Sequence, residues 1–232
     1  MRSVDLVLIA RNEEAGVRTL LDRIDRSLFR SVLAIDGHST DRTRELLEAA
    51  GIPVHVQRRP GLGAAMLEAR ELVSADAFVF FHPDGNEDPA DLGRMVALLA
   101  SGHEFVVASR MIAGAWNEED HLTFRWRKWA NQGFALLANS LFAHGGNRTS
   151  DVTNGFRGIA CATFDRMRLT STDLTMDYQM VIRALKLGLP ITEFPTRESV
   201  RIGGETNFHS VATGIAELKL VWREVRNGRR GI

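Results

Sequence analysis

The first hundred residues alternate short apolar runs with stretches of helical spacing, and this alternation narrows the possible folds more than any other feature. Strands are expected over residues 5–10, 31–35, 54–57, 77–81 and 104–108. Helical patterns fill the intervals at 14–26, 41–50, 63–73 and 89–100, and Asp88 before Pro89 is a good helix start. This order predicts an α/β protein whose mostly parallel central sheet is flanked by helices.

The order of elements changes after residue 109. An aromatic and basic segment over 122–142 is followed by a short run at 155–160, a helical pattern at 176–187 and a strand pattern at 191–194. Neither an internal repeat nor a Pro- or Ser-rich linker separates the two halves. The 232 residues are therefore expected to form a single domain.

Charge and cysteine content exclude several classes of protein. The 29 Lys and Arg residues balance 29 Asp and Glu residues, which argues against a protein held on nucleic acid by its net charge. Cys161 is alone, which favours a cytoplasmic location, and no segment is apolar enough to predict a transmembrane helix. Basic side chains nevertheless cluster in two places, which favours an anionic ligand or surface. They are Arg125, Arg127, Lys128 and Arg148, in a stretch without acids, and Lys219, Arg223, Arg226, Arg229 and Arg230.

Polar residues end three of the expected strands. Residues 11–14, 36–41 and 82–89 follow the first, second and fourth runs and contain several carboxylates. Ligands of open parallel sheets bind beyond the carboxyl ends of the strands, so these acids are expected to converge on one edge. Carboxylates held close together repel unless a cation or hydrogen-bond donors share them, and oxygen ligands select Mg²⁺ or Mn²⁺. The sequence thus predicts a metal-bridged phosphate ligand.

Seven segments resemble, in order and spacing, the signatures of a known enzyme family. Those at 10–14, 36–43, 61–65 and 84–86 are similar to successive motifs of family-2 glycosyltransferases, which have a GT-A fold. Those at 109–110, 151–157 and 201–206 resemble the branch that contains dolichyl-phosphate mannosyltransferase and other polyprenyl-phosphate glycosyltransferases. The resemblance covers roughly residues 4–208.

The resemblance implies a GT-A, Rossmann-like domain with a defined activity. The activity is metal-dependent, inverting transfer of a sugar from GDP-mannose or a UDP-sugar onto a polyprenyl or dolichyl phosphate. Residues 1–108 would bind the nucleotide sugar, 109–208 would bind the acceptor, and 209–232 would form a C-terminal basic helix. Two alternatives stay open. One is the same donor chemistry directed at a soluble hydroxyl or phosphorylated acceptor, and the other is a catalytically inactive sugar-nucleotide-binding protein.

The resemblance also implies a donor site, position by position. Ala10, Asn12 and Glu13 would border the base and ribose, and Asp36 would contact the base. Further donor contacts are implied for Gly61, Gly63, Asp84 and Arg201.

The resemblance makes Asp84 the metal ligand on the donor diphosphate, with Mn²⁺ or Mg²⁺ as the ion and Asn86 as a second ligand. A divalent Lewis acid suits this reaction because the leaving nucleoside diphosphate gains negative charge. His82 replaces the first acid of the family's Asp-x-Asp motif. Imidazole ligates Mn²⁺ but is a poor Mg²⁺ ligand. His82 is therefore a ligand with a bias toward Mn²⁺, a neighbour that hydrogen-bonds phosphate or ribose, or a substitution that disables catalysis.

Acceptor binding is implied for four residues of the second half: Arg127, Asp151, Asn154 and Arg157. The arginines have a fork geometry suited to phosphate, although Arg157 could instead pair with Asp151 and hold its loop in shape. An ionised phosphate acceptor is already nucleophilic and requires no general base. For a hydroxyl acceptor, Asp177 is the leading base candidate. The predicted catalytic residues are Asp84, Asp177 and Arg201.

The stretch 122–142 also raises the question of membrane contact. Its apolar and aromatic residues recur at near-helical spacing, which suits a helix lying at the inner face of a membrane. Packing of the same stripe on the edge of the sheet is the alternative, and it is the commoner outcome. The pattern at 218–230 allows peripheral attachment as well.

Overall fold

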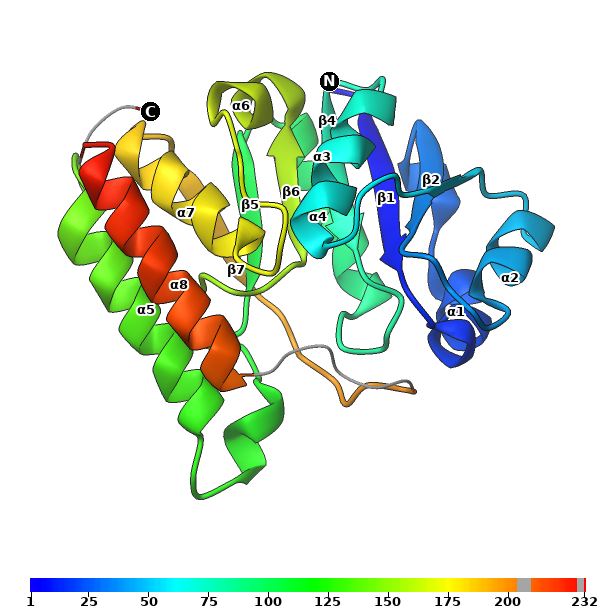
Figure 1. Cartoon of the computed structure of the whole chain (residues 1–232). Coiled ribbons are helices and arrows are strands. Elements are labelled where there is room, and N and C mark those ends of the chain that lie inside the picture. Colours follow the sequence, from blue (N-terminus) through cyan, green and yellow to red (C-terminus); the bar gives the residue numbers. More distant parts are fainter. Residues whose placement is uncertain (204–209, 229–231) are drawn as a thin grey trace.

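The computed structural model describes residues 1–203, 210–228 and 232. Within these ranges the chain forms one seven-stranded sheet in the order β3-β2-β1-β4-β6-β5-β7 (Figure 1). The strands are β1 Val4–Ala10, β2 Ser31–Asp36, β3 Val54–Val56, β4 Ala77–Phe81, β5 Phe105–Ser109, β6 Arg157–Ala160 and β7 Ile191–Pro195. β6 is antiparallel to its neighbours β4 and β5, and the other strand pairs are parallel. The expected α/β class with a mostly parallel sheet is confirmed.

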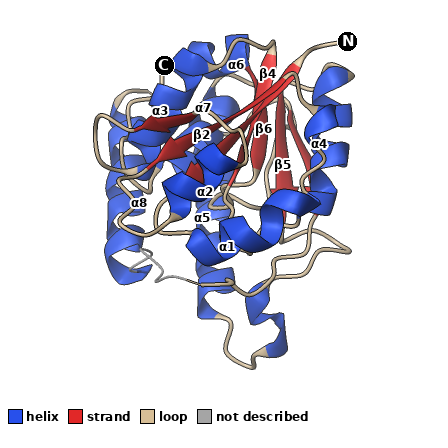
Figure 2. Ribbon diagram, turned by 90° about the vertical axis from the view of Figure 1, so that its right-hand side faces the viewer, coloured by secondary structure: helices blue, strands red, loops and turns tan. Residues whose placement is uncertain are grey.

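Helices lie on both faces of the sheet (Figure 2). They are α1 Glu14–Leu20, α2 Thr43–Ala49, α3 Leu62–Leu72, α4 Leu92–Ala100, α5 Trp126–Phe142, α6 Cys161–Arg166, α7 Met176–Lys186 and α8 Ser210–Arg226. Successive strand side chains point to opposite faces, so Phe80 belongs to one core and Phe81 to the other. The first core contains residues of α3, α5 and α7, and the second contains residues of α1, α2 and α4.

Two helices differ from the sequence prediction at their ends. The pattern over 14–26 predicts one helix, but α1 stops at Leu20 and short 3-10 helices follow, η1 Leu21–Arg23 and η2 Arg26–Leu28. The Asp25 side chain accepts a hydrogen bond from Ser27 N and starts η2 as a separate turn. The helix expected over 89–100 begins as the 3-10 turn η3 Pro89–Asp91, which Asp88 caps through Ala90 N as predicted.

The sequence does not predict α6, because six residues are too few to show helical periodicity.

The antiparallel strand β6 brings distant segments together at the site. β6 lies between β4 and β5. Its first residue, Arg157, is the ladder partner of Phe80 on β4 and of Val107 on β5. The loop before β6 therefore lies beside the turn after β4. There, a Cβ on Gly155 would approach Cε1 of His82 to 2.5 Å, so the close contact requires glycine.

Candidate active site

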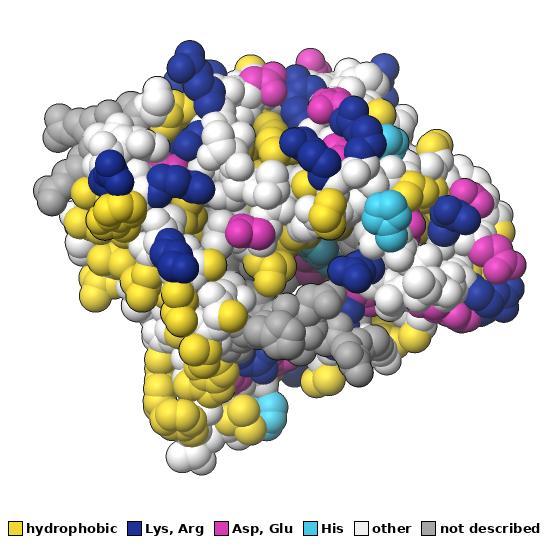
Figure 3. All heavy atoms as spheres, in the orientation of Figure 1, with side chains coloured by type: hydrophobic (Ala, Val, Ile, Leu, Met, Phe, Trp, Pro, Cys, Tyr) yellow, Lys and Arg dark blue, Asp and Glu magenta, His cyan; other side chains and the backbone are white. Residues whose placement is uncertain are grey.

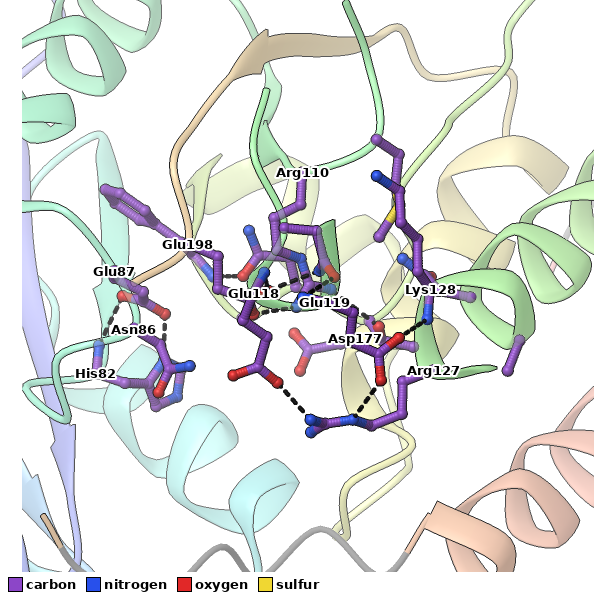
Figure 4. A pocket seen from close by; sticks show the side chains of 18 of the residues that line it. His82, Asn86, Glu87, Arg110, Glu118, Glu119, Arg127, Lys128, Asp177 and Glu198 are labelled. Atoms are coloured by element: carbon purple, nitrogen blue, oxygen red, sulfur yellow. Dashed lines mark hydrogen bonds and ion pairs between the residues drawn. The ribbon is translucent and has the colours of Figure 1, made fainter. Parts of the chain in front are cut away.

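A cavity of about 560 Å³ opens beyond the carboxyl ends of β4 and β5 (Figure 4). The turn after β4, the start of α5, the start of α7, the inner side of α8 and the segment 196–201 all contribute to its wall. Its ionisable lining residues are His82, Asp84, Glu87, Arg110, Glu118, Glu119, Arg127, Lys128, Asp177, Glu198, Arg201 and Glu217. This edge of the sheet is the one on which the sequence predicts that acids converge.

Three predicted donor-site residues meet in one ion-pair cluster. Arg201 Nη1 lies 2.9 Å from Asp84 Oδ2, and Arg201 Nη2 donates to Glu13 Oε1. Arg201 Nε donates to the Gly203 carbonyl at 2.7 Å, which fixes the plane of the guanidinium. Burial raises the pKa of Glu13 to about 7, although the Arg201 guanidinium favours its ionised form. A single cation thus pairs with two carboxylates that follow different strands.

The turn that carries the predicted metal ligands is closely held. Asp84 Oδ1 accepts a hydrogen bond from Asn86 N at 2.9 Å, and the Asp84 and Asn86 carbonyls accept from Ile202 N at 2.8 Å and Ser199 N at 3.0 Å. Gly85 has φ +99°, and a Cβ there would lie 2.5 Å from Ile202 Cγ1, so this position requires glycine. The segment 199–203 is therefore docked on the turn.

The donor set of this turn fits a hard divalent cation. A carboxylate at Asp84 and an amide oxygen at Asn86 are ligands of the kind that Mg²⁺ and Mn²⁺ accept. In the part of the chain that the structure describes, no three His, Cys, Asp or Glu side chains are grouped to hold a metal. Such an ion would complete its coordination with substrate phosphate oxygens and water, which is the usual arrangement for Mg²⁺ at phosphate sites.

His82 is paired with an acid that the sequence analysis does not single out. Glu87 accepts from His82 Nδ1 at 2.7 Å with one oxygen and from His82 N at 2.8 Å with the other. Burial lowers the pKa of His82, but the Glu87 carboxylate outweighs burial and raises the pKa to about 9. Glu87 belongs to the polar run 82–89, so its position five residues after His82 was a visible signal.

Three residues predicted to border the base and ribose or to contact the base lie at the ends of β1 and β2. Asn12 Oδ1 accepts from Thr40 N at 2.8 Å, and both oxygens of Asp36 lie 3.2 Å from Ser39 N. The Ala10 carbonyl accepts from Gly37 N at 2.8 Å. Asn12, Asp36 and Ala10 thus join the two loops beyond β1 and β2, and their contacts with a nucleotide stay predictions.

Gly61 and Gly63 have a packing role at the start of α3. A Cβ on Gly61 would lie 2.2 Å from the Thr172 carbonyl oxygen, and one on Gly63 would lie 2.5 Å from the Ser171 carbonyl oxygen. Neither glycine is among the residues that line the cavity. Close approach of two backbone segments explains both glycines, and their contact with the donor stays a prediction.

The expected basic patch at the start of α5 is neutralised, which corrects the sequence analysis. The 3-10 helix η4 Glu118–His121 lies against the first turn of α5. Arg127 pairs with Glu118 at 2.7 Å and with Glu119 at 3.0 Å, and Lys128 Nζ pairs with Asp120. Arg125 pairs with Asp120 as well, at 3.3 Å. These acids immediately precede the acid-free stretch 121–150, so three of the four predicted free cations have a carboxylate partner, and Arg148 has none among the described residues.

Arg157 and Asp151 are buried, which corrects their predicted role in acceptor contact. The Arg157 side chain has 0% exposure and donates to the carbonyls of Val152 at 2.8 Å, Asp177 at 2.6 Å and Asn154. Asp151 pairs with Arg110 at 2.8 Å rather than with Arg157. Arg157 therefore holds the loop in shape through backbone carbonyls, and Asn154 lines the cavity above it.

Asp177 and Glu217 add two carboxylates to the lining of the cavity. Asp177 is 5% exposed, and its Oδ1 has no hydrogen-bond partner among the described residues but lies 3.6 Å from Arg157 Nε. Burial raises the pKa of Asp177, despite the Arg157 charge. Burial and the Asp177 charge together raise the pKa of Glu217 to about 7. Asp177 thus has an oxygen available to a substrate.

Arg110, Glu198 and Glu217 line the cavity but are absent from the predicted site. Arg110 Nη1 lies 2.6 Å from Glu198 Oε1, and Arg110 also holds Asp151. The motif at 109–110 was a signal for Arg110. Glu198 and Glu217 belong to no motif in the sequence. Glu198 reaches the cavity from a loop and Glu217 from α8, so only the packing of these segments brings them there. Residues 204–206 of the last predicted motif lie outside the described residues.

A family model supplies the observation that decides membership. The model described as "Glycosyl transferase family 2" matches residues 5–166, which include the turn carrying Asp84 and the loop carrying Asn154. The chain belongs to glycosyltransferase family 2. This membership confirms the resemblance seen in the motifs and agrees with the observed fold.

Named relatives of this family-2 glycosyltransferase share much of its length. "Glycosyltransferase AglJ" of Haloferax volcanii is 32% identical over 205 residues, 88% of this chain and 65% of the relative. The chain therefore spans a little less than two thirds of that protein. "Undecaprenyl-phosphate 4-deoxy-4-formamido-L-arabinose transferase" of Pseudomonas paraeruginosa is 29% identical over 141 residues, 56% of this chain and 39% of the relative.

Solved structures show the same fold for this family-2 glycosyltransferase. Glucosyl-3-phosphoglycerate synthase from Mycobacterium tuberculosis in complex with UDP superposes with a TM-score of 0.73 at 22% identity, covering 96% of this chain and 79% of that one. Its complex with Mn²⁺ and UDP-glucose gives a TM-score of 0.69 at 21% identity, covering 95% and 79%. The likeness establishes a GT-A fold.

Proposed function

We propose that this family-2 glycosyltransferase catalyses metal-dependent, inverting transfer of one sugar from a nucleotide-diphosphate donor, GDP-mannose or a UDP-sugar, to a polyprenyl phosphate. The observation that carries the proposal is the cluster of Glu13, Asp84 and Arg201 at the carboxyl ends of β1 and β4, beside a charged cavity. The names of the relatives support it, since one is a glycosyltransferase and another acts on undecaprenyl phosphate. Residues 1–108 would hold the donor and 109–208 the acceptor.

The cluster can perform the donor chemistry. Asp84 and Asn86 would hold the divalent ion, which supplies Lewis-acid charge for the departing diphosphate. Arg201 can exchange Asp84 for a phosphate oxygen, because a guanidinium binds both oxyanions through the same fork. Glu13 keeps Arg201 at the cavity during that exchange. We propose Mn²⁺ or Mg²⁺ as the ion, and Mn²⁺ is present in the related synthase structures.

A phosphate acceptor would bind at the other end of the cavity. Its ionised oxygen is nucleophilic without a general base. Arg110 and Arg127 are the guanidinium groups that line this end, and each would have to exchange a carboxylate partner for phosphate. A polyprenyl phosphate supplies that anionic group.

One observation favours a second acceptor class, a soluble hydroxyl or phosphorylated molecule. Asp177 Oδ1 is buried without a hydrogen-bond partner among the described residues, and the pKa of this carboxyl is raised by burial. A carboxylate with those properties can accept the proton of an attacking hydroxyl. The related synthase structures contain phosphoglyceric acid, a soluble molecule.

A panel of GDP- and UDP-sugars with Mn²⁺, Mg²⁺ or EDTA tests the donor assignment. We expect one nucleotide class to raise the melting temperature in the presence of metal, because a ligand at a hundredfold excess over its Kd stabilises the native state by about 2.7 kcal/mol. EDTA should reduce that shift, and free nucleosides should give none. No shift with any donor would contradict the proposal. Metal-dependent hydrolysis of the stabilising donor would exclude an inactive binding protein.

The outer faces of α5 and α8 support the proposal of peripheral membrane contact. Hydrophobic side chains gather over these helices, with basic side chains beside them (Figure 3). The exposed apolar residues are Trp126, Trp129 and Leu136 on α5 and Val211, Ile215, Leu218 and Trp222 on α8. Lys219, Arg223 and Arg226 are exposed on α8, and Arg229 and Arg230 lie outside the described residues. No described helix has the length and apolar character needed to cross a membrane.

This α5–α8 face has the composition of an interfacial surface. Exposed tryptophans suit the headgroup region, and neighbouring cations attract anionic lipids. Trp126 of this face lines the cavity, and so does Gly214 of α8, so the cavity lies next to the face. A cytoplasmic location, expected from the lone Cys161, stays a prediction.

Vesicle binding tests the α5–α8 face. Trp129→Ser with Trp222→Ser should reduce partition into vesicles that contain anionic lipid by at least roughly tenfold, because burying one such side chain is worth about 1.5–3 kcal/mol. Co-flotation with the vesicles is the measurement. Leu72→Ser on α3 is the matched control, since Leu72 is also an exposed apolar residue, and it should bind as the unmodified protein does. Equal binding of the double variant and the control would contradict membrane contact through this face.

A further inference from the structure

Two residues that line the cavity present a buried polar atom without a hydrogen-bond partner among the described residues: His82 Nε2 and Asp177 Oδ1. Asp177 Oδ1 still has the Arg157 guanidinium at 3.6 Å. Within the same described ranges, the ion pair of His82 is made by Nδ1 with Glu87, and it leaves Nε2 open. A buried nitrogen loses its water without gaining a partner, so such an atom in a cavity calls for a ligand.

The position of the His82 ring is fixed from three sides. The residue directly follows β4, whose last residue is Phe81. The Glu87 carboxylate accepts hydrogen bonds from both Nδ1 and the backbone N–H of His82, so it fixes the ring relative to the backbone (Figure 4). The ring also rests on Gly155, where a Cβ would lie 2.5 Å from Cε1 and 3.0 Å from Nδ1. Nε2 is thus held in one place before any substrate arrives.

The surroundings of His82 argue for contact with substrate rather than with a metal. Both oxygens of Glu87 already accept hydrogen bonds from His82, so Glu87 is committed to the ring and its backbone N–H. Although His82, Asp84 and Glu87 occupy one short loop, they do not form a metal-binding group in the described residues. Asp84, two residues along, is the proposed ligand of the divalent ion on the donor diphosphate. The sugar-diphosphate part of the donor would therefore lie beside Nε2.

We propose that His82 hydrogen-bonds an oxygen of the donor's sugar-diphosphate group through Nε2, and that Glu87 is the positioning residue that holds the ring for this contact. A carboxylate only accepts hydrogen bonds, so Glu87 keeps a proton on Nδ1 and leaves Nε2 for the substrate. The partner oxygen is a sugar hydroxyl or a phosphoryl oxygen.

Nucleotide affinity measured by titration calorimetry tests this inference, which rests on the proposed function. His82→Asn should weaken binding of the nucleotide sugar by about tenfold, the effect of one lost hydrogen bond to a polar or charged group. Glu87→Gln should weaken binding of the nucleotide sugar as well. Weakening seen with the nucleoside diphosphate alone assigns the contact to a phosphoryl oxygen, and weakening confined to the nucleotide sugar assigns it to a sugar hydroxyl.

A double-mutant cycle separates positioning from a structural role. If Glu87 acts through His82, adding Glu87→Gln to His82→Asn changes the affinity no further, whereas an independent effect is additive and overturns the positioning role. Gly155→Ala is the second variant, because it displaces the ring while leaving its chemistry intact, and it should weaken nucleotide binding too. Melting temperatures without ligand show whether each variant folds.

Two results would overturn the donor contact. The first is unchanged nucleotide affinity in folded His82→Asn and Gly155→Ala. The second is a tenfold or greater loss of Mn²⁺ affinity in His82→Asn, measured by electron paramagnetic resonance, with nucleotide affinity in EDTA unchanged, because that result would make His82 a metal ligand. If the unmodified protein binds no nucleotide sugar, the proposed function itself fails, so the two failures are distinguishable.

Discussion

Asp84→Ala is expected to lower the rate of sugar transfer by about three orders of magnitude, because it removes the carboxylate proposed to hold the divalent ion on the donor diphosphate. The change also releases Arg201 Nη1, while Arg201 Nη2 remains on Glu13. The measurement is kcat for transfer, or for donor hydrolysis, at saturating Mn²⁺ and donor. A wild-type rate in this variant would contradict the assignment of Asp84.

Asp88→Ala is the matched control in the same loop. Asp88 caps η3 through Ala90 N, pairs with Arg23 at 3.3 Å and is not among the residues that line the cavity. Loss of the cap should cost about 1 kcal/mol of stability and leave the rate essentially unchanged. An equal loss of rate in Asp84→Ala and Asp88→Ala would show that the loss comes from a changed loop shape and not from removal of a metal ligand.

Arg157→Met should lower the free energy of unfolding by about 3–5 kcal/mol, the cost of breaking a buried ion pair and its hydrogen bonds. The methionine would leave the carbonyls of Val152, Asn154 and Asp177 without their donor, beside a carboxylate that has lost its nearest cation. Urea denaturation of the full chain measures the change. Arg157→Lys should recover only part of it, because one ammonium cannot reproduce the planar fork.

The same experiment separates a structural Arg157 from one that binds acceptor phosphate. Arg127→Ala is the comparison, because the Arg127 side chain is 44% exposed, although one of its two partners, Glu119, is buried. The partly exposed pair with Glu118 should be worth about 0–1 kcal/mol. A stable Arg157→Met protein with a raised acceptor KM would restore the predicted acceptor contact and contradict the structural role.

The parts of the fold that sequence predicts well are those with local signals. β1, β2, β4 and β5 lie where apolar runs predict them, since strands buried on both faces are apolar along their whole length. β6 differs, because its four residues include Arg157 and Gly158 and nothing within them gives the direction of the strand. Direction depends on pairing with β4 and β5, which are far away in the sequence.

The site shows the same division between local and long-range information. The convergence of Glu13 and Asp84 follows from the parallel sheet, because both residues come just after strands that end at one edge. The prediction of Arg201 as a site residue depended on the family motif at 201–206. The pairing of Arg127 with Glu118 and Glu119 depends on how η4 packs against α5. Counting charges along a stretch of sequence does not show that packing. Glu217 reaches the cavity only through the packing of α8.

The antiparallel strand β6 also has a consequence for how the two proposed substrates would be exchanged. Because β6 hydrogen-bonds to both β4 and β5, the turn that carries Asp84 and the loop that carries Asn154 grow from one continuous sheet. Neighbouring strands in a sheet are about 4.8 Å apart, and their backbone bonds resist separation. With the donor at the first loop and the acceptor at the second, as proposed, the strand ladder would set the spacing between them. Entry and release would then rely on loop and side-chain rearrangement, without a hinge between two rigid bodies.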